Sequence, residues 1–280
     1  MTDEFDPTTV PIQAAATVMM IRAGEMNDDG SSIEVFMLRR TGNASFGAGM
    51  YVFPGGRVDD VDAAAGIEPY CRGLDDASAS AQLGLAAGGL AYWVASIREC
   101  FEEAGILLAT KRDGSALELN DHDRHAVHDG TLSMIELCRR DDLVLELSTT
   151  QYVDHWITPL GEKRRFDTRF FVTEAPAGQQ GLHDDKETVD SLWVEPSVAL
   201  QMMEAGELQM MPPTVANLRW LTPFSTPADA VAAGQALTEI TPILPKLLRD
   251  ESGRITGISR PGDADYDDIV IVDPQMDARS

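Results

Sequence analysis

Three glutamates and an arginine stand at spacings that could bind a metal ion: Arg98, Glu99, Glu102 and Glu103. In a helix, residues three and four positions apart share a face, so the three carboxylates would crowd together. Crowded carboxylates repel one another, and a hard cation such as Mg²⁺ or Mn²⁺, which prefers oxygen ligands, relieves that repulsion. The pattern therefore predicts a Mg²⁺ or Mn²⁺ site on one face of a helix.

Two elements must position these residues. The first is the helix itself, whose apolar residues recur at helical spacing on the opposite side: Val94, Ile97, Phe101 and Ala104. The second is the glycine pair Gly55-Gly56, which follows a short predicted strand at residues 50–53. A glycine pair lets the backbone turn sharply and approach another element closely. The small side chains of Ala95 and Ser96 leave room for this loop to lie across the helix.

These residues resemble the Nudix box, G-x5-E-x7-R-E-U-x-E-E-x-G-U, where U is aliphatic. Gly56 stands at the first glycine and Asp62 at the first glutamate. The second half of the box is matched by Arg98, Glu99, Glu102, Glu103, Gly105 and Ile106. The chain departs from the motif at Asp62, and residues 63–89 are interpreted as an insertion within the box. The resemblance implies the Nudix fold of the α/β (α+β) class, an α/β/α sandwich around a mixed sheet, with a C-terminal helical extension.

The resemblance also implies roles for the site residues. The metal ligands would be Glu99, Glu102 and Glu103, with Glu103 the central ligand, and the backbone carbonyl of Gly55. Arg98 would hold Glu99 in position through a charge-assisted hydrogen bond. The general base would be either Glu99 or Glu187, an acid in the loop before Trp193, and the sequence does not separate these two.

Motifs in the second half of the chain narrow the resemblance. W-x-T-P at residues 156–159, R-F-D-T-x-F-F at 165–171, L-W-V at 192–194 and P-P-T at 212–214 are similar to one Nudix subgroup. This subgroup is the coenzyme A diphosphatases of the moiety-X-motif-nineteen type, whose box also carries a long insertion. The resemblance implies hydrolysis of coenzyme A or acyl-CoA to 3′,5′-ADP and a 4′-phosphopantetheine product. The substrate would contact Gly55 and Gly56 and the basic side chains Arg39, Arg40 and Arg165.

Two other functions stay open at this point. Hydrolysis of NADH, ADP-ribose or another nucleoside diphosphate compound would use the same chemistry. A Nudix-fold regulator that binds nucleotides without catalysis is the alternative of a different class. The aspartate at position 62 keeps that alternative open, whereas the intact Arg98-Glu99 and Glu102-Glu103 pairs argue against it.

The composition restricts the kinds of molecule that the protein is expected to bind. The net charge is −24, with 22 Lys and Arg against 46 Asp and Glu, which disfavours binding to nucleic acid or anionic membranes. No stretch has the length of a membrane span, and residues 1–6 are acidic and unlike a signal peptide. The three cysteines form no C-x-x-C pair. We therefore expect a cytoplasmic enzyme whose partner is a small-molecule nucleotide, with a homodimer left open.

Further patterns lead to expectations for the rest of the chain, which we treat as a single Nudix domain over residues 1–280. Residues 1–9 are expected to be disordered, and residues 237–280 to form a C-terminal extension with an edge strand at 269–272. Strands are expected at 13–21, 33–39, 155–159, 165–172 and 192–194, and helical structure near 76–85, 131–140 and 143–147. A zinc site at His122, His125 and His128 is disfavoured because their spacing does not converge in a helix.

Overall fold

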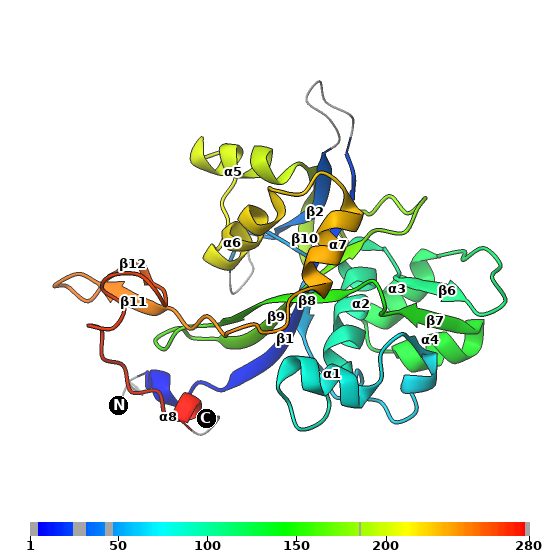
Figure 1. Cartoon of the computed structure of the whole chain (residues 1–280), viewed down its shortest axis with the longest axis horizontal. Helices are drawn as coiled ribbons and strands as arrows, with labels where there is room; N and C mark the ends of the chain where they lie inside the picture. The colour runs from blue at the N-terminus through cyan, green and yellow to red at the C-terminus, as the bar shows by residue number, and fades with distance from the viewer. Residues whose placement is uncertain (1–4, 25–31, 43–46, 185, 278–280) are drawn as a thin grey trace.

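A computed structural model describes residues 5–24, 32–42, 47–184 and 186–277 (Figure 1). At its centre is a mixed sheet in the order β10-β2-β1-β9-β8, with β3 paired to β2 and β4 paired to β1. Strands β1 and β9 run parallel, and the other neighbours are antiparallel. The strands are β1 (Ile12–Ala23), β2 (Ile33–Arg40), β3 (Tyr51–Val52), β4 (Gly55–Arg57), β8 (Gln151–Ile157), β9 (Arg165–Glu174) and β10 (Thr188–Val194).

The core lies on both faces of this sheet because side chains alternate along each strand. Val18 and Met20 of β1 pack into one apolar cluster, and Met19 and Ile21 pack into the other. The first cluster is covered by α1 (Asp76–Leu83), α2 (Leu90–Ala104), α3 (Asp121–His128) and α4 (Met134–Asp141). The second is covered by α5 (Pro196–Glu204), α6 (Pro212–Leu221) and α7 (Pro227–Gln235) (Figure 1). The predicted α/β/α sandwich is confirmed.

Helix α2 carries the acidic motif and ends where the motif's glycine stands. Gly105 has a φ of 66° and donates its N–H to the carbonyl of Phe101, a left-handed C-cap that glycine adopts without strain. The helix is buried on nearly all sides, including the side chains of Arg98, Glu102 and Glu103. The acidic face is therefore not a solvated surface but the wall of an interior site.

The insertion at residues 63–89 folds beside α2. It contains the 3₁₀ turn η2 (Glu68–Tyr70), strand β5 (Cys71–Arg72) and the expected short helix α1. Strand β5 joins β7 (Leu143–Glu146) and β6 (Ala109–Lys111) in a second, three-stranded sheet. The expectation of helical structure at 143–147 is wrong, because Leu145 pairs with Cys71 on one side and with Ala109 on the other.

The two ends of the described chain lie together. The 3₁₀ turn η1 (Pro7–Thr9) replaces the disorder expected for residues 1–9, of which 1–4 lie outside the described residues. Gln275, in α8 (Pro274–Asp277), donates to the carbonyls of Thr8 and Val10 and accepts from the N–H of Ile12.

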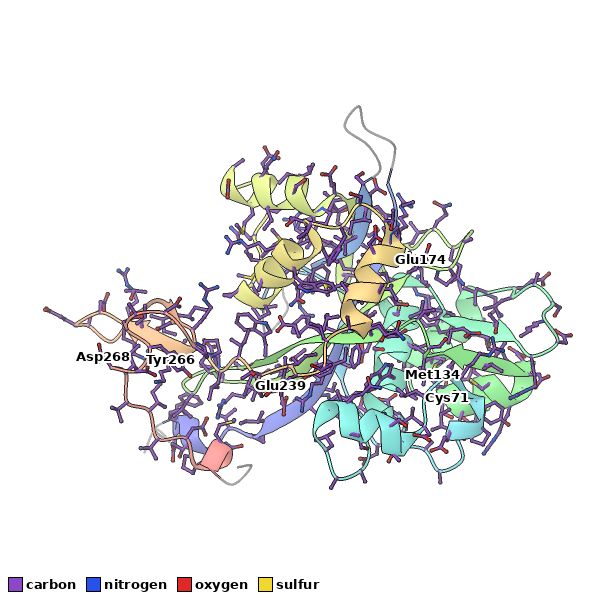
Figure 2. All side chains as sticks on the ribbon, in the orientation of Figure 1. Cys71, Met134, Glu174, Glu239, Tyr266 and Asp268 are labelled. Carbon is purple, nitrogen blue, oxygen red and sulfur yellow. The ribbon has the colours of Figure 1, made fainter. Side chains whose placement is uncertain are left out.

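The C-terminal segment forms a hairpin of its own, β11 (Lys246–Arg249) and β12 (Ile255–Ser259). The expected edge strand at 269–272 is wrong: this stretch pairs with no strand in the described chain, and the side chains of Val270 and Val272 are exposed. Figure 2 shows Tyr266 and Asp268 at the hairpin end of the molecule, opposite Cys71 and Met134. None of the helices described is long and apolar enough to cross a membrane.

Candidate active site

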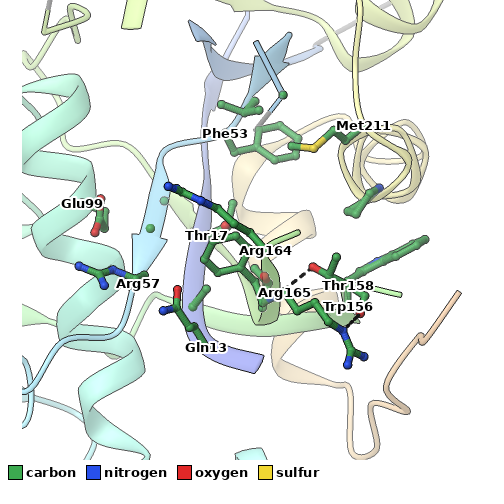
Figure 3. A pocket seen from close by; sticks show the side chains of 18 of the residues that line it. Gln13, Thr17, Phe53, Arg57, Glu99, Trp156, Thr158, Arg164, Arg165 and Met211 are labelled. Atoms are coloured by element: carbon green, nitrogen blue, oxygen red, sulfur yellow. Dashed lines mark hydrogen bonds between the residues drawn. The ribbon is translucent and has the colours of Figure 1, made fainter. Parts of the chain in front are cut away.

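One large cavity, of about 1100 Å³, opens beside α2 and β4 (Figure 3). Its walls come from segments far apart in the chain: β1, β4, α2, the β8–β9 connection, the start of α6 and the C-terminal hairpin. The cavity brings together nearly all of the site residues expected from the sequence, namely Arg40, Gly55, Gly56, Arg98, Glu99, Glu102, Glu103, Arg165 and Glu187.

The glycine pair is required by close packing. Strand β4 pairs with β1, so that a Cβ at Gly55 would lie 2.6 Å from the backbone oxygen of Ala16. A Cβ at Gly56 would lie 2.4 Å from a carboxylate oxygen of Glu99. Real Cβ contacts are longer than this, so a Cβ at Gly55 would clash with the backbone of β1, and a Cβ at Gly56 would force the Glu99 carboxylate to move.

Arg98 organises the acidic residues around it. Its Nε and Nη2 donate to the two carboxylate oxygens of Asp62 at 2.8 and 2.9 Å, a bidentate pair. Its Nη1 donates to Glu99 at 2.8 Å and to Glu102 at 3.1 Å. Burial alone lowers the pKa of Arg98, but the bonds to Asp62 and the charges of Glu99 and Glu102 outweigh burial and raise the pKa. The guanidinium therefore stays charged and holds both glutamates in place.

Asp62 has a role that its position in the box alone did not reveal. Its side chain is 1% exposed, accepts the N–H of Asp59 and binds Arg98 across the whole insertion. The first acid of the motif is thus a structural partner of Arg98, and aspartate is long enough for that contact.

Burial makes the glutamates at the cavity wall costly to ionise. Burial raises the pKa of Glu99 to about 8, even though Arg98 opposes the shift. Burial and then the charge of Glu99 raise the pKa of Glu103. Glu103 Oε2 accepts the N–H of Gly55 at 3.0 Å, and Arg98 makes no described bond to it. A divalent cation, which binds carboxylate oxygens, would offset this repulsion, so the donor set fits Mg²⁺ or Mn²⁺.

These carboxylates are not arranged as a finished cage. Within the described part of the chain, no three His, Cys, Asp or Glu side chains lie close enough together to hold a metal ion. Glu99 and Glu102 turn to Arg98, and Glu103 turns to the backbone of Gly55. Coordination would require these carboxylates to turn toward a shared ion, so the assignment of Glu99, Glu102, Glu103 and Gly55 as ligands stays a prediction.

Arg40 and Glu187 lie on the Glu103 side of the cavity. The charge of Arg40 lowers the pKa of Glu103, and the charge of Glu187 raises it, so both groups are near it. The Nε of Arg40 is buried and has no hydrogen-bond partner among the described residues. Glu187 is exposed at the cavity wall, and its backbone carbonyl accepts the N–H of Thr41. The contact of Arg40 with substrate stays a prediction, and both Glu99 and Glu187 remain candidates for the base.

The other two arginines expected to contact substrate are placed differently. Arg39 is exposed and does not line the cavity. Arg165 is fully buried, with Nη2 donating to Asp273 at 2.5 Å and Nε to the carbonyl of Thr158 at 3.0 Å. Its Nη2 and Nε are engaged inside the protein, whereas its buried Nη1 has no hydrogen-bond partner among the described residues, so a contact between Arg165 and substrate stays a prediction.

Sequence reasoning missed three basic residues near the site. Arg164 lines the cavity, but the R-F-D-T motif directed attention to its neighbour. His128 also lines the cavity, with Nδ1 4.0 Å from Glu102 Oε2, whereas the His122 side chain is 90% exposed. Arg124 donates to the backbone carbonyls of Glu102 and Glu103 and so caps α2. Helix capping by a distant residue leaves no spacing signal in the sequence.

Comparisons with known proteins agree with this geometry. The family model of the NUDT19 Nudix domain matches residues 71–221. The acyl-coenzyme A diphosphatase NUDT19 of Gallus gallus is 29% identical, over 83% of this chain and 72% of its own length. The acyl-coenzyme A diphosphatase NUDT19 of Homo sapiens is 26% identical, also over 83% of this chain and 72% of its own length.

Solved structures resemble the fold as well. The crystal structure of a NUDIX hydrolase from Alicyclobacillus acidocaldarius superposes with a TM-score of 0.67 at 25% sequence identity, over 80% of this chain and 97% of the other. The family model spans more than half of the chain, and the Arg98–Glu103 motif lies inside it against a glycine-rich strand. The chain therefore belongs to the NUDT19 Nudix family and is a Nudix hydrolase.

Proposed function

We propose that this protein is a Mg²⁺- or Mn²⁺-dependent diphosphatase that hydrolyses coenzyme A or acyl-CoA. The observation that carries the proposal is the large cavity in which buried glutamates of α2 face basic and apolar walls. Its volume, about 1100 Å³, stands at the upper end of the range of small-molecule sites, which suits a long substrate. The two relatives compared above are named acyl-coenzyme A diphosphatases, which supports the same substrate class.

The reaction adds water to one phosphorus of the diphosphate and breaks its bond to the bridging oxygen. The products are 3′,5′-ADP and 4′-phosphopantetheine, or its acylated form. A bound divalent cation would supply charge neutralisation of the phosphates and a lower pKa for water. Glu99, Glu102, Glu103 and the carbonyl of Gly55 are the residues proposed to hold it.

The chain's own groups have distinct roles in this proposal. Arg98, fixed by Asp62, holds Glu99 and Glu102 at the cavity wall. Arg40 offers its unpartnered Nε to a phosphate oxygen beside Glu103. Glu99 or Glu187 takes the proton from the attacking water. The side chains of Phe53, Trp156 and Met211 give the cavity apolar surface for the less polar arm of the substrate.

Turnover of a panel of nucleotides tests the proposal. Coenzyme A, an acyl-CoA, NADH and ADP-ribose would be incubated with the protein with Mg²⁺ and again with EDTA. We expect the highest kcat/KM for coenzyme A or acyl-CoA, loss of activity with EDTA and recovery with Mg²⁺ or Mn²⁺. A clear preference for NADH or ADP-ribose would overturn the substrate, and no turnover of any compound would favour a regulator that only binds nucleotides.

Zinc removal provides a control for the metal. Among the histidines of α3, His122 points to solvent while His128 faces the cavity, so they form no joint site. A zinc-selective chelator should leave activity unchanged. Loss of activity with that chelator alone would contradict the assignment of the metal to the glutamates.

A further inference from the structure

The positive charges that line the cavity are not equally available to a ligand. Arg98 is bound to Asp62, Glu99 and Glu102, and Arg165 is bound to Asp273. Arg57 lies 3.6 Å from Asp59. The remaining cationic residues in the cavity wall are Arg40, Lys163 and Arg164. The protein has a net charge of −24, so a cationic side chain without an ion-pair partner inside the cavity requires a functional explanation.

Arg164 and Arg40 stand on different walls. Arg40 ends β2 near Glu103, whereas Arg164 belongs to the connection between β8 and β9. The Arg164 side chain is exposed to the cavity and makes no ion pair with any residue that the structure describes. Figure 3 shows Arg164 and Arg165 extending to opposite sides, with Arg164 directed toward the side of the cavity where Glu99 lies.

The buried start of β9 anchors the neighbourhood of Arg164. Arg164 lies in a bend directly before β9, so its position depends on how Arg165 is held. Arg165 is locked inside by Asp273 and by the carbonyl of Thr158. The connection itself is backed by the C-terminal hairpin, because a Cβ at Gly161 would lie 2.9 Å from both Leu247 and Arg249. The tail thereby holds the turn that presents Arg164.

We propose that Arg164 binds a phosphomonoester of the substrate, a group separate from the diphosphate that is hydrolysed. The inference rests on the proposed function, in which that group is the 3′-phosphate of coenzyme A. A guanidinium offers a planar pair of N–H donors to two phosphate oxygens, which a lysine cannot match. Arg164 would thus be the residue that separates coenzyme A from NADH and ADP-ribose, which lack this phosphate.

Equilibrium binding tests the inference without relying on turnover. Calorimetric titration of the full chain with 3′,5′-ADP and with 5′-AMP, in the presence of Mg²⁺, measures the contribution of the 3′-phosphate. We expect wild type to bind 3′,5′-ADP about 10-fold or more tightly than 5′-AMP, as a charge-assisted hydrogen bond predicts. In Arg164→Ala the two Kd values should lie within about 2-fold of each other, while Arg164→Lys should keep part of the difference.

The matched control is Arg219→Ala. Arg219 is also exposed and unpaired among the described residues, but it lies on α6 outside the cavity wall. The Arg219→Ala substitution removes the same charge from a position outside the cavity wall, so it should leave the preference for 3′,5′-ADP intact. If Arg219→Ala also lost the preference for 3′,5′-ADP, the effect would come from the change in net charge, and the inference would be overturned.

Other outcomes decide between the inference and the proposed function. If wild type hydrolyses coenzyme A but Arg164→Ala keeps the preference for 3′,5′-ADP, the role of Arg164 is wrong and the function stands. The same holds if Lys163→Ala, and not Arg164→Ala, removes the preference. If wild type neither hydrolyses coenzyme A nor distinguishes the two nucleotides, both the function and the role of Arg164 are wrong.

Discussion

Arg98 is the residue on which the geometry of the acidic site depends. It donates hydrogen bonds to Asp62, Glu99 and Glu102 and to the backbone carbonyl of Arg57, so it joins α2 to the loop after β4. The Arg98–Asp62 pair is buried, and a buried ion pair that loses one partner leaves an uncompensated charge. Asp62 therefore holds Arg98 in position and so supports the site.

Replacing Asp62 by alanine tests that support. Arg98 keeps Glu99 and Glu102 but loses its bidentate partner, so the free energy of unfolding should fall by roughly 3 kcal/mol. Urea denaturation followed by circular dichroism measures the change. Asp60→Ala is the control, because Asp60 lies in the same loop but is not a partner of Arg98 among the described hydrogen bonds. Equal stability of the Asp62 variant and wild type would contradict the supporting role.

Substituting the central glutamates tests their part in the chemistry. Glu103→Gln and Glu102→Gln should each lower kcat by at least about 100-fold. Neither should unfold the protein, because a neutral amide costs less to bury than a carboxylate whose pKa burial has already raised. Glu204→Gln, at the exposed end of α5, is the control. Near-wild-type turnover of both variants at saturating Mg²⁺ would mean that the metal site is misassigned.

At the scale of secondary-structure elements, the site is the contact between α2 and β4. Strand β4 approaches the helix closely at Gly56, which has no side chain. A Cβ at Gly56 would overlap the Glu99 carboxylate at 2.4 Å. The packing of one strand therefore decides where a carboxylate points.

Gly56→Ala should displace the Glu99 side chain and lower kcat/KM by about 10-fold or more, since small misplacements at a catalytic centre are costly. Gly42→Ala is the matched control, because no heavy atom of the described residues, apart from its chain neighbours, lies within 4 Å of the position that its Cβ would take. Steady-state kinetics on coenzyme A gives the comparison. Unchanged kinetics in the Gly56 variant would show that Glu99 does not act from its observed position.

Local sequence patterns predicted the helix and strands that carry the motif. They did not predict the segments whose structure depends on residues far away in the sequence. The helix at α2 and the strands β1, β2, β8, β9 and β10 follow from apolar periodicity and turn residues. Residues 143–147 form a short, mostly apolar run whose periodicity does not separate strand from helix, and pairing with β5 of the insertion makes them a strand. The run at 269–272 has strand composition but finds no partner strand among the described residues.

The arginine proposed to bind substrate could not be selected from the sequence for a similar reason. Arg164 and Arg165 are adjacent and chemically identical, but Arg165 is the one held inside, by the carbonyl of Thr158 and by Asp273, more than a hundred residues away. Likewise, the pairing of Asp62 with Arg98 spans the insertion. The motif predicted which residue types gather at the site, whereas tertiary contacts determine which of them stay free.

At the scale of the whole molecule, the C-terminal segment closes the fold onto its own beginning. Gln275 binds Thr8, Val10 and Ile12, and Asp273 binds Arg165 at the start of β9. These contacts place the hairpin residues Leu247 and Ile258 in the cavity wall. The tail, for which the sequence suggested no role, therefore completes the substrate cavity.

The central claim is that this cavity hydrolyses the diphosphate of coenzyme A at the glutamates of α2. The most direct test is product analysis by mass spectrometry after incubation of the protein with coenzyme A and Mg²⁺ in ¹⁸O-labelled water. The account predicts 3′,5′-ADP and 4′-phosphopantetheine, with one ¹⁸O atom in one of the two products, and no reaction in Glu103→Gln. Intact coenzyme A, or 3′-dephospho-coenzyme A with free phosphate as the products, would contradict it.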